Sequence, residues 1–336
     1  MSSPHPDAVR LLHGFRGYQL VVAACRLGLP DMIAAAPLGA DEIATCTGLD
    51  PDATRRFLRG LAAWGFFAED ADGRYSPTPI SDVFRSDRPG LRNMTLMLSE
   101  EAYPTWGELM YSLQTGKSAF EHIHGKGRWE KLAEDPESAA QFNAAMVETS
   151  TRVSGEVVAA YDFGWARSVV DVGGGHGALL AGVLRANPNL RGVLFDLAPG
   201  LAGAAEALAA AGVIDRVEIV EGSFFDTLPK GGDAYMLKSI LHDWDDEHAA
   251  KILAACRTAM APESRLLIVE RLVPDHVTTG ARDLASVMSD LHMMVLLGGR
   301  ERTSSEFSKL FQPAGFRLTR DIEMASEFHI VEARPA

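Results

Sequence analysis

Residues 237–247 concentrate side chains that could carry out acid–base chemistry. His242 lies at the end of a predicted strand. Its imidazole, with an ordinary pKa of about 6.5, can remove the proton of a hydroxyl group such as a phenol, whose pKa is about 10. An acid on the other ring nitrogen would fix the tautomer and stabilise the imidazolium, and Glu270 and Glu301 are the two candidates. These residue types therefore predict a general base at His242.

Two other interpretations of His242 are open at this point. The residue could end the strand without any chemical role. It could also belong to a metal site, because four acids and a second histidine follow it closely: Asp243, Asp245, Asp246, Glu247 and His248. Three of these acids also suit the first turn of a helix, where a carboxylate interacts favourably with the helix dipole. We therefore favour a base that works without a metal.

A glycine-rich turn, residues 173–177, follows an apolar run that contains Asp171. Glycines let the chain turn sharply and let a ligand approach the backbone, and the start of the next helix supplies amide donors. The spacing is G-x-G-x-G, which differs from the G-x-G-x-x-G of dinucleotide-binding proteins. Asp196 ends the next predicted strand, where an acid meets ribose hydroxyls in such folds, although it could instead cap the following helix. Together these features favour a ribose-containing ligand.

The scaffold for these groups is an alternation of strands and helices that begins at residue 168. Helices between the strands imply a parallel, doubly wound sheet. The last two strands are joined by a short link and should pair antiparallel as a hairpin at one edge. Ligands bind at the carboxyl ends of the strands in such sheets, and the glycine turn, Asp196, Ser223, His242 and Glu270 all lie there. The predicted strands are residues 168–173, 192–196, 217–222, 233–241, 265–270, 316–322 and 327–333.

The first 90 or so residues have the layout of a winged helix, with three helices followed by a hairpin. The predicted helices are residues 9–29, 40–47 and 51–64, and the hairpin strands are residues 66–69 and 74–77. Arg55, Arg56 and Arg59 on the third helix raise the possibility of DNA binding. Acids outnumber basic residues between Asp41 and Arg92, so a dimerisation module is the better interpretation. We predict three parts: residues 1–95, 96–165 and 166–336.

The composition restricts the class of protein. A net charge of −13 over 336 residues argues against a broad nucleic-acid-binding face. The three cysteines, Cys25, Cys46 and Cys256, lie far apart, which suits a reducing compartment and gives neither a disulfide framework nor a zinc motif. We see no signal peptide and no long apolar run that could cross a membrane. The expectation is a cytoplasmic protein that binds neither nucleic acid nor membrane.

Five motifs in order carry a resemblance to a known family: DVGGGHG, FDLAPG, GSFFDTLP, LKSILHDWDDE and GGRERT. They resemble the plant caffeic-acid and hydroxyindole type of O-methyltransferase and its bacterial natural-product relatives, over nearly the whole chain. The resemblance implies an α/β fold with the Rossmann-like sheet of class I methyltransferases and a mainly α-helical, winged-helix-like N-terminal dimerisation domain. It also implies S-adenosylmethionine as cofactor, a homodimer formed through the N-terminal domain, and no metal.

The resemblance further assigns roles to individual residues. Gly173 and Gly175 would approach the methionine part of the cofactor, and Asp196 would hold its ribose. His242 would be the general base, flanked by Glu270 and Glu301. The resemblance places four side chains near the adenine: Ser223, Phe224, Lys238 and Trp244. It places Asp243 near the reacting hydroxyl.

Two departures from the family pattern concern ligand contacts. Ser223 stands where the family usually has Asp, so the adenine contact loses its charge. Leu296 and Leu297 stand where plant members carry a polar residue that touches the substrate. The substrates of the plant enzymes therefore cannot be assigned to this protein. Core packing explains the candidates for the substrate pocket as well as ligand binding does, because they are apolar or aromatic residues and one histidine. The candidates are Phe120, Trp129, Phe142, Met146, Met288, His292 and Met293.

The predicted function is methyl transfer from S-adenosylmethionine to a hydroxyl of a small aromatic molecule by direct displacement. Three alternatives have different sequence requirements. A family member with hydroxylating or decarboxylating chemistry would be expected to lose His242 first. A winged-helix DNA-binding regulator is disfavoured by the acidic charge. An NAD-dependent oxidoreductase is disfavoured by the glycine spacing and the final antiparallel hairpin.

Overall fold

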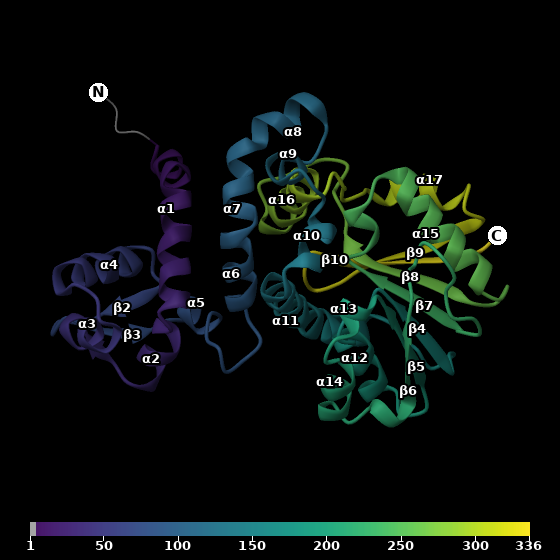
Figure 1. The fold of residues 1–336 in the computed structure, drawn as a ribbon, viewed down its shortest axis with the longest axis horizontal. Helices are drawn as coiled ribbons and strands as arrows, with labels where there is room; N and C mark the ends of the chain where they lie inside the picture. Colours follow the sequence, from purple (N-terminus) through teal and green to yellow (C-terminus); the bar gives the residue numbers. More distant parts are fainter. Residues whose placement is uncertain (1–4) are drawn as a thin grey trace. The chain divides into compact units, whose positions relative to one another are not determined.

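The computed structural model describes residues 5–336, which form two compact units (Figure 1). The first unit contains the chain up to Tyr103 together with Ala144–Glu148. The second contains Pro104–Asn143 and Thr149–Ala336. The division of residues 96–165 into a separate segment stays a prediction. Within the described residues, no helix combines the length and apolar character needed to cross a membrane.

The first unit has the predicted helices and hairpin. A third strand, only two residues long, was not predicted, and the sheet order is β1-β3-β2. The predicted helix 9–29 corresponds to α1, which ends at Arg26, before the left-handed Gly28 with φ 67°. A further helix that was not predicted, α2, begins at Leu29 with Pro30 in its first turn. The elements are α1 (Pro6–Arg26), α2 (Leu29–Ala35), β1 (Leu38–Gly39), α3 (Ala40–Thr47), α4 (Pro51–Ala63), β2 (Phe67–Glu69), β3 (Arg74–Pro77), α5 (Pro79–Asp82) and α6 (Arg92–Glu100).

A run of helices between residues 102 and 160 precedes the large sheet of the second unit. The longest of them, α11, begins after Asp135, whose carboxylate accepts hydrogen bonds from the amides of Glu137 and Ser138. Five residues of α11 belong to the first unit and the rest to the second. The elements are α7 (Ala102–Thr105), η1 (Trp106–Glu108), α8 (Leu109–Thr115), α9 (Ala119–His124), α10 (Arg128–Glu134) and α11 (Pro136–Ala160).

The second unit is built on a seven-stranded sheet of order β6-β5-β4-β7-β8-β10-β9. The first five strands in this order are parallel, and β10 pairs antiparallel with both β8 and β9, as the sequence predicts. The strands are β4 (Ser168–Val172), β5 (Arg191–Asp196), β6 (Val217–Glu221), β7 (Ala234–Lys238), β8 (Arg265–Arg271), β9 (Phe316–Glu323) and β10 (Phe328–Pro335). The helices among them are α12 (Ala178–Ala186), α13 (Ala198–Leu201), η2 (Ile214–Arg216), α14 (Ala204–Ala210), η3 (Leu241–Asp243), α15 (Asp246–Ala259), α16 (Ala281–Leu296) and α17 (Ser304–Phe311).

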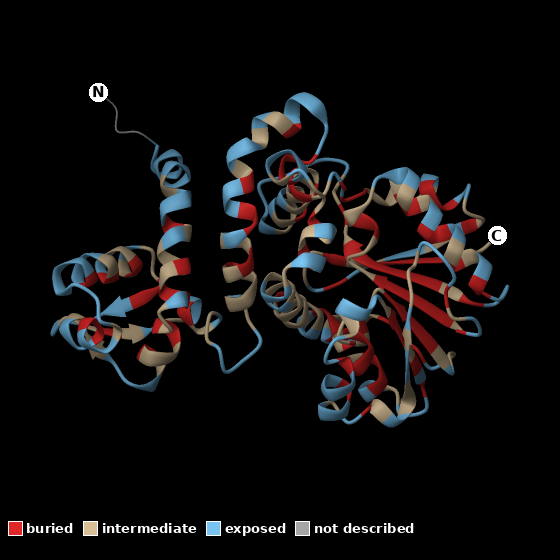
Figure 2. Ribbon diagram, in the orientation of Figure 1, coloured by how far each residue is buried: buried red, intermediate tan, exposed pale blue. Residues whose placement is uncertain are grey.

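The central strands β4, β7 and β8 are buried on both faces, because successive side chains point to opposite sides and helices cover each side (Figure 2). Val169 and Leu194 pack into a core that also contains residues of α12 and α14. Val170 and Phe195, their neighbours in sequence, pack into a second core with residues of α15 and α17. The carboxyl edge of the parallel strands is thereby held rigidly between two helical layers.

One predicted boundary is wrong in a way that concerns the site. The strand predicted at 233–241 ends at Lys238, because Ser239 adopts a left-handed backbone conformation with φ 55°. Non-glycine residues rarely adopt this conformation, and it directs the chain out of the sheet. His242 therefore lies on the short helix η3 beyond the strand and not at the strand end itself.

Candidate active site

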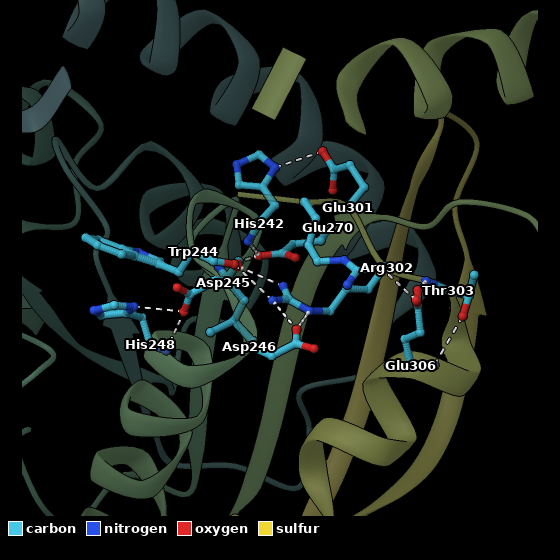
Figure 3. A network of polar contacts seen from close by, with 12 residues as sticks. His242, Trp244, Asp245, Asp246, His248, Glu270, Glu301, Arg302, Thr303 and Glu306 are labelled. Atoms are coloured by element: carbon cyan, nitrogen blue, oxygen red, sulfur yellow. Dashed lines mark hydrogen bonds and ion pairs between the residues drawn. The ribbon is translucent and has the colours of Figure 1, made fainter. Parts of the chain in front are cut away.

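The residues around His242 form a buried polar network (Figure 3). We call residues 241–244 the histidine turn. It follows β7 and lies beside the end of β8 and the segment 299–302, both of which direct polar groups toward it. This arrangement brings together side chains that are up to about 60 residues apart in the sequence.

The His242 ring contacts a carboxylate on each side. Its Nδ1 lies 2.8 Å from Oε1 of Glu301, and its Nε2 lies 3.4 Å from Oδ1 of Asp243. Glu301 has no exposed side-chain surface and also accepts a hydrogen bond of 2.6 Å from the Ser289 hydroxyl. Because a carboxylate can only accept, the Nδ1 atom donates to Glu301, and the neutral ring has its lone pair on Nε2.

The surrounding charges favour the protonated ring. Burial by itself would lower the pKa of His242, but the carboxylates of Glu301, Asp243 and Glu270 outweigh it and raise the pKa to about 9. Burial raises the pKa of Asp243 to about 6. The pKa of Glu301 is lowered despite its burial, since the adjacent His242 stabilises the carboxylate. The site therefore holds a histidine that attracts a proton strongly.

Glu270 contacts the backbone of the histidine turn and not the imidazole. A single oxygen, Oε1, accepts hydrogen bonds from the amides of Ile240 at 3.1 Å, Leu241 at 2.6 Å and His242 at 3.2 Å. Burial raises the pKa of Glu270 to about 7. Of the two acids considered as partners of the ring, Glu301 makes that contact, and Glu270 holds the turn that carries the ring.

The acids after His242 have other partners than a metal. Asp245 caps α15, since its carboxylate accepts the His248 amide at 2.8 Å. Asp246 contacts the guanidinium of Arg302 at 2.8 Å. Within residues 5–336, no group of three or more His, Cys, Asp or Glu side chains is arranged to hold a metal ion. The predicted first turn of a helix is thus confirmed for this segment.

Gly299 was not identified from the sequence, although it lies in the GGRERT motif. A Cβ atom at this position would lie 2.2 Å from the backbone oxygen of His242. The next residue, Arg300, donates its amide to the same oxygen at 2.8 Å. Only glycine lets segment 299–302 approach the histidine turn this closely.

We therefore expect the substitution Gly299→Ala to displace the histidine turn and to lower kcat by about 10-fold or more, since small misplacements are costly at a reacting centre. Gly107→Ala is the matched control, because a Cβ there meets nothing within 4 Å. Steady-state kinetics and thermal unfolding of both variants check this expectation. Wild-type kcat in a folded Gly299→Ala variant would contradict it.

The glycine-rich turn and Asp196 lie next to each other. Gly173, Gly175 and Gly177 all have left-handed φ values, of 70°, 56° and 75°. The carboxylate of Asp196 accepts hydrogen bonds from the amides of Gly175 at 2.8 Å and Leu197 at 2.7 Å. A Cβ on Gly175 would point into open space, so the turn leaves room for a ligand against the backbone. Each Asp196 oxygen keeps a second lone pair that can accept a hydroxyl.

Aromatic rings gather beyond this turn. Trp244 packs edge-on against Phe225 at 4.8 Å and against Phe224 at 6.2 Å between ring centroids. The indole nitrogen of Trp244 is buried without a hydrogen-bond partner. The Ser223 hydroxyl accepts a hydrogen bond of 3.2 Å from the amide of Phe225, which sequence reasoning missed. This cluster offers flat apolar surface at the ligand edge of the sheet.

Two buried charges under the glycine turn complete this part of the site. Lys238 donates to the Ser239 hydroxyl at 3.3 Å, and burial lowers its pKa to about 8. Asp171 is buried, one of its oxygens has no hydrogen-bond partner, and burial raises its pKa to about 7. Asp171 is the acid of the DVGGGHG motif, and its burial on the strand before the turn is not visible from residue type.

The structure brings only some of the substrate-pocket candidates together. Trp129 and Phe142 pack edge-on at 5.5 Å. The Nδ1 atom of His292 accepts a hydrogen bond of 3.3 Å from the indole of Trp106, a residue not proposed for the pocket. Burial and the positive charge of Arg128 lower the pKa of His292 to about 3, so its ring is neutral. The other candidates are scattered: Phe120 and Met293 are buried, Met288 is exposed, and Met146 belongs to the first unit.

Comparison with known proteins identifies two family domains in the chain. The O-methyltransferase domain matches residues 106–317, and the O-methyltransferase dimerisation domain matches residues 9–87. A phenazine O-methyltransferase of Lysobacter antibioticus is 40% identical over 97% of this chain and 95% of its own length. The mitomycin biosynthesis 6-O-methyltransferase of Streptomyces lavendulae is 36% identical over 97% and 93%.

This chain is also similar to a relative named as an N-methyltransferase and to solved structures. The phenazine-1-carboxylate N-methyltransferase of Pseudomonas aeruginosa is 31% identical over 98% of this chain and 97% of its own. The crystal structure of LaPhzM superimposes with a TM-score of 0.92, at 39% identity and 98% coverage of both chains. An O-methyltransferase of neocarzinostatin biosynthesis, solved with S-adenosylmethionine and 2-hydroxy-5-methyl naphthoic acid, gives a TM-score of 0.80, at 32% identity over 95% and 96%.

Proposed function

Because the chain belongs to the family of S-adenosylmethionine-dependent O-methyltransferases, we propose that it methylates a hydroxyl of a small aromatic natural product with His242 as general base. The single observation that carries the assignment is the placement of the His242 ring. Glu301 holds Nδ1, so that the basic nitrogen is Nε2, at the carboxyl edge of the sheet. A buried histidine oriented by a buried acid is the arrangement that proton abstraction needs.

The residues at the glycine turn fit the cofactor. S-adenosylmethionine, when bound, supplies a methyl group on a sulfonium that an oxygen nucleophile can displace. Gly175, where the backbone is open, and Gly173 beside it would receive its methionine part, and Asp196 would accept its ribose hydroxyls. Ser223, Phe224, Lys238 and Trp244 would surround the adenine, and the buried unpartnered indole nitrogen of Trp244 supports a polar partner there.

In the proposed reaction, Nε2 of His242 takes the proton of the acceptor hydroxyl and Glu301 stabilises the resulting imidazolium. Asp243, whose carboxylate lies 3.4 Å from Nε2, would orient the hydroxyl. A pKa of about 9 on the histidine is close to the pKa of about 10 of a phenol, so the proton transfer is nearly balanced. Glu270 acts on the backbone of the turn, as a positioning residue.

The acceptor pocket would be formed by residues of the second unit, with Phe120, Trp129 and Phe142 from the helices before the sheet and Met288, His292 and Met293 from α16. A panel of hydroxylated phenazines and naphthoates, each with its amino counterpart, tests the acceptor atom. With S-adenosylmethionine, we expect the hydroxylated compounds to gain one methyl group on oxygen, read by mass spectrometry and NMR. Methylation of the amines alone would contradict the proposal.

The pH dependence of the reaction follows from the raised pKa of His242. The base must be neutral, so activity is lost as the pH falls through this pKa. We expect kcat/KM to rise about tenfold from about pH 7 to about pH 8, to keep rising through pH 9, and to level only about one pH unit above the pKa of about 9. Circular dichroism over the same range controls for unfolding. A rate that stays constant between about pH 7 and 9 would contradict a base with this pKa.

We also propose that the chain forms a homodimer through its first unit. Apolar side chains on α1 are strongly exposed: Leu11 at 83%, Leu12 at 68% and Phe15 at 53%. They lie inside residues 9–87, which match the dimerisation domain. We expect light scattering to give a dimer for the wild type and a monomer for the double variant Leu12→Asp with Phe15→Asp. Val277→Asp, at an exposed apolar position of the second unit, should remain a dimer. A dimeric double variant would contradict this surface.

A further inference from the structure

Arg302 is the most buried cation of the polar network, with 1% of its surface exposed. It donates from Nη1 to the carbonyl of Leu241 and from Nη2 to the carbonyl of Trp244, both at 2.9 Å (Figure 3). Its Nε and Nη2 also contact Oδ1 of Asp246, at 3.0 and 2.8 Å. A guanidinium buried this deeply requires such partners, because an unpaired buried charge is very costly.

The contacts of Arg302 complement those of Glu270. Glu270 accepts from the amides at the start of the histidine turn, whereas Arg302 donates to the carbonyls of its first and last residues. One negative and one positive side chain thus hold opposite polar groups of the same short piece of backbone. This piece carries His242.

Arg302 directly follows Glu301, the acid that contacts the imidazole, so the positions of the two side chains are linked through the backbone. The backbone of Arg302 forms an isolated bridge with Leu272, just after the end of β8, where the Val273 amide donates to the Arg302 carbonyl at 3.2 Å. The same anchored segment therefore places Glu301 against the ring and Arg302 against the turn. Displacement of the turn relative to this segment would change the Nδ1 to Glu301 contact directly.

We propose that Arg302 is a positioning residue for methyl transfer, which holds the histidine turn in the orientation that aligns His242 with Glu301. This inference rests on the proposed role of His242 as base. The geometry requires arginine specifically, because a planar guanidinium can donate in several fixed directions at once. The ammonium of a lysine is a point charge on a flexible stem and cannot reach both carbonyls and Asp246.

The substitution Arg302→Lys tests the proposal, since it keeps the positive charge and removes the planar guanidinium that donates in several directions. We expect kcat to fall by about 10- to 100-fold, while KM for the acceptor and Kd for S-adenosylmethionine change by less than about 3-fold. The acidic limb of the pH–rate profile should move to lower pH, since the ring loses its fixed contact with Glu301. A purely structural residue would lower the Tm without changing the kcat of folded enzyme or this limb.

Two substitutions at the start of α15 keep the test valid if Arg302→Lys does not fold. Asp246→Ala removes two contacts of Arg302 from a side chain that is 63% exposed, and should lower kcat by about 2- to 10-fold with the same pH shift. Asp245→Ala removes the helix cap without touching Arg302, and should lower only the Tm. A wild-type kcat and pH profile in folded Arg302→Lys, or in Asp246→Ala if Arg302→Lys does not fold, would overturn the proposal.

A double variant separates this inference from the proposed function. If His242 is the base, His242→Ala is slow by itself, and adding Arg302→Lys should slow it by no more than about 2-fold, because residues that act as a unit are not additive. A fully additive loss would overturn a role through His242. If His242→Ala alone retains wild-type kcat, the base assignment fails, whatever Arg302→Lys shows.

Discussion

The substitution His242→Ala is expected to lower kcat by about 10²–10⁴-fold, because it removes the only proposed base for the acceptor hydroxyl. The methyl donor and the pocket remain, so Kd for S-adenosylmethionine should stay within about 3-fold of wild type. Single-turnover mass spectrometry with a hydroxylated phenazine measures the rate, and isothermal titration measures cofactor binding. The loss should be smaller for acceptors that are already ionised at the assay pH.

His248→Ala is the matched control for this prediction. His248 lies six positions further along the chain, and its ring contacts Asp245 at 2.8 Å and not the acids around His242. The control variant should keep wild-type kcat. Equal rates for wild type and His242→Ala would mean that the acceptor loses its proton without help from this ring.

The substitution Glu301→Gln is expected to lower kcat by about 10²–10⁴-fold, although it barely changes the shape of the side chain. The amide group of glutamine can donate to Nδ1 of His242, which would leave the proton on Nε2, where the base must be free. It also removes a negative charge that stabilises the imidazolium. Loss of that charge lowers the pKa of His242, so the remaining activity should persist to lower pH than in the wild type.

Glu306→Gln controls for the loss of a carboxylate on the same stretch of chain. Glu306 caps α17 through the Thr303 amide at 2.9 Å and does not contact the His242 ring. This variant is expected to keep the wild-type pH profile. A Glu301→Gln variant with unchanged kcat would show that the tautomer of His242 is not set by this contact.

Local signals in the sequence were sufficient for most of the elements. The strands of the second unit have apolar residues on both faces, and glycine or proline marks most of the boundaries. Asp50 and Pro51 predicted the start of α4, and the structure confirms that the Asp50 carboxylate accepts the Ala53 amide at 2.8 Å. Helix starts and turns are encoded this way because capping involves residues only a few positions apart.

The end of the strand before His242 is a boundary that local sequence signals did not predict. The run from Asp233 to Leu241 is apolar enough to continue as a strand, and only the left-handed Ser239 ends it. Serine is not a residue that predicts such a conformation. Hydrogen bonds to Glu270 on β8 hold the backbone after Ser239 in this conformation. They depend on pairing between strands that are far apart in the sequence.

The sequence by itself indicated which side chains could react and the edge of the sheet at which they meet. Parallel strands joined by helices bring their carboxyl ends together, so His242, Glu270, Asp196 and the glycine turn had to lie near one another. The motifs also determined the family and its cofactor.

Only the tertiary structure decided which acid contacts the His242 ring and which groups Gly299 and Arg302 contact. Glu270 and Glu301 have the same chemistry, and both lie far from His242 in sequence. Glu270 contacts the backbone of the histidine turn and Glu301 contacts the ring, and this difference depends on how distant segments pack in three dimensions. Residue type and spacing carry no information about that packing, because hydrogen bonds form or fail according to the relative placement of whole elements.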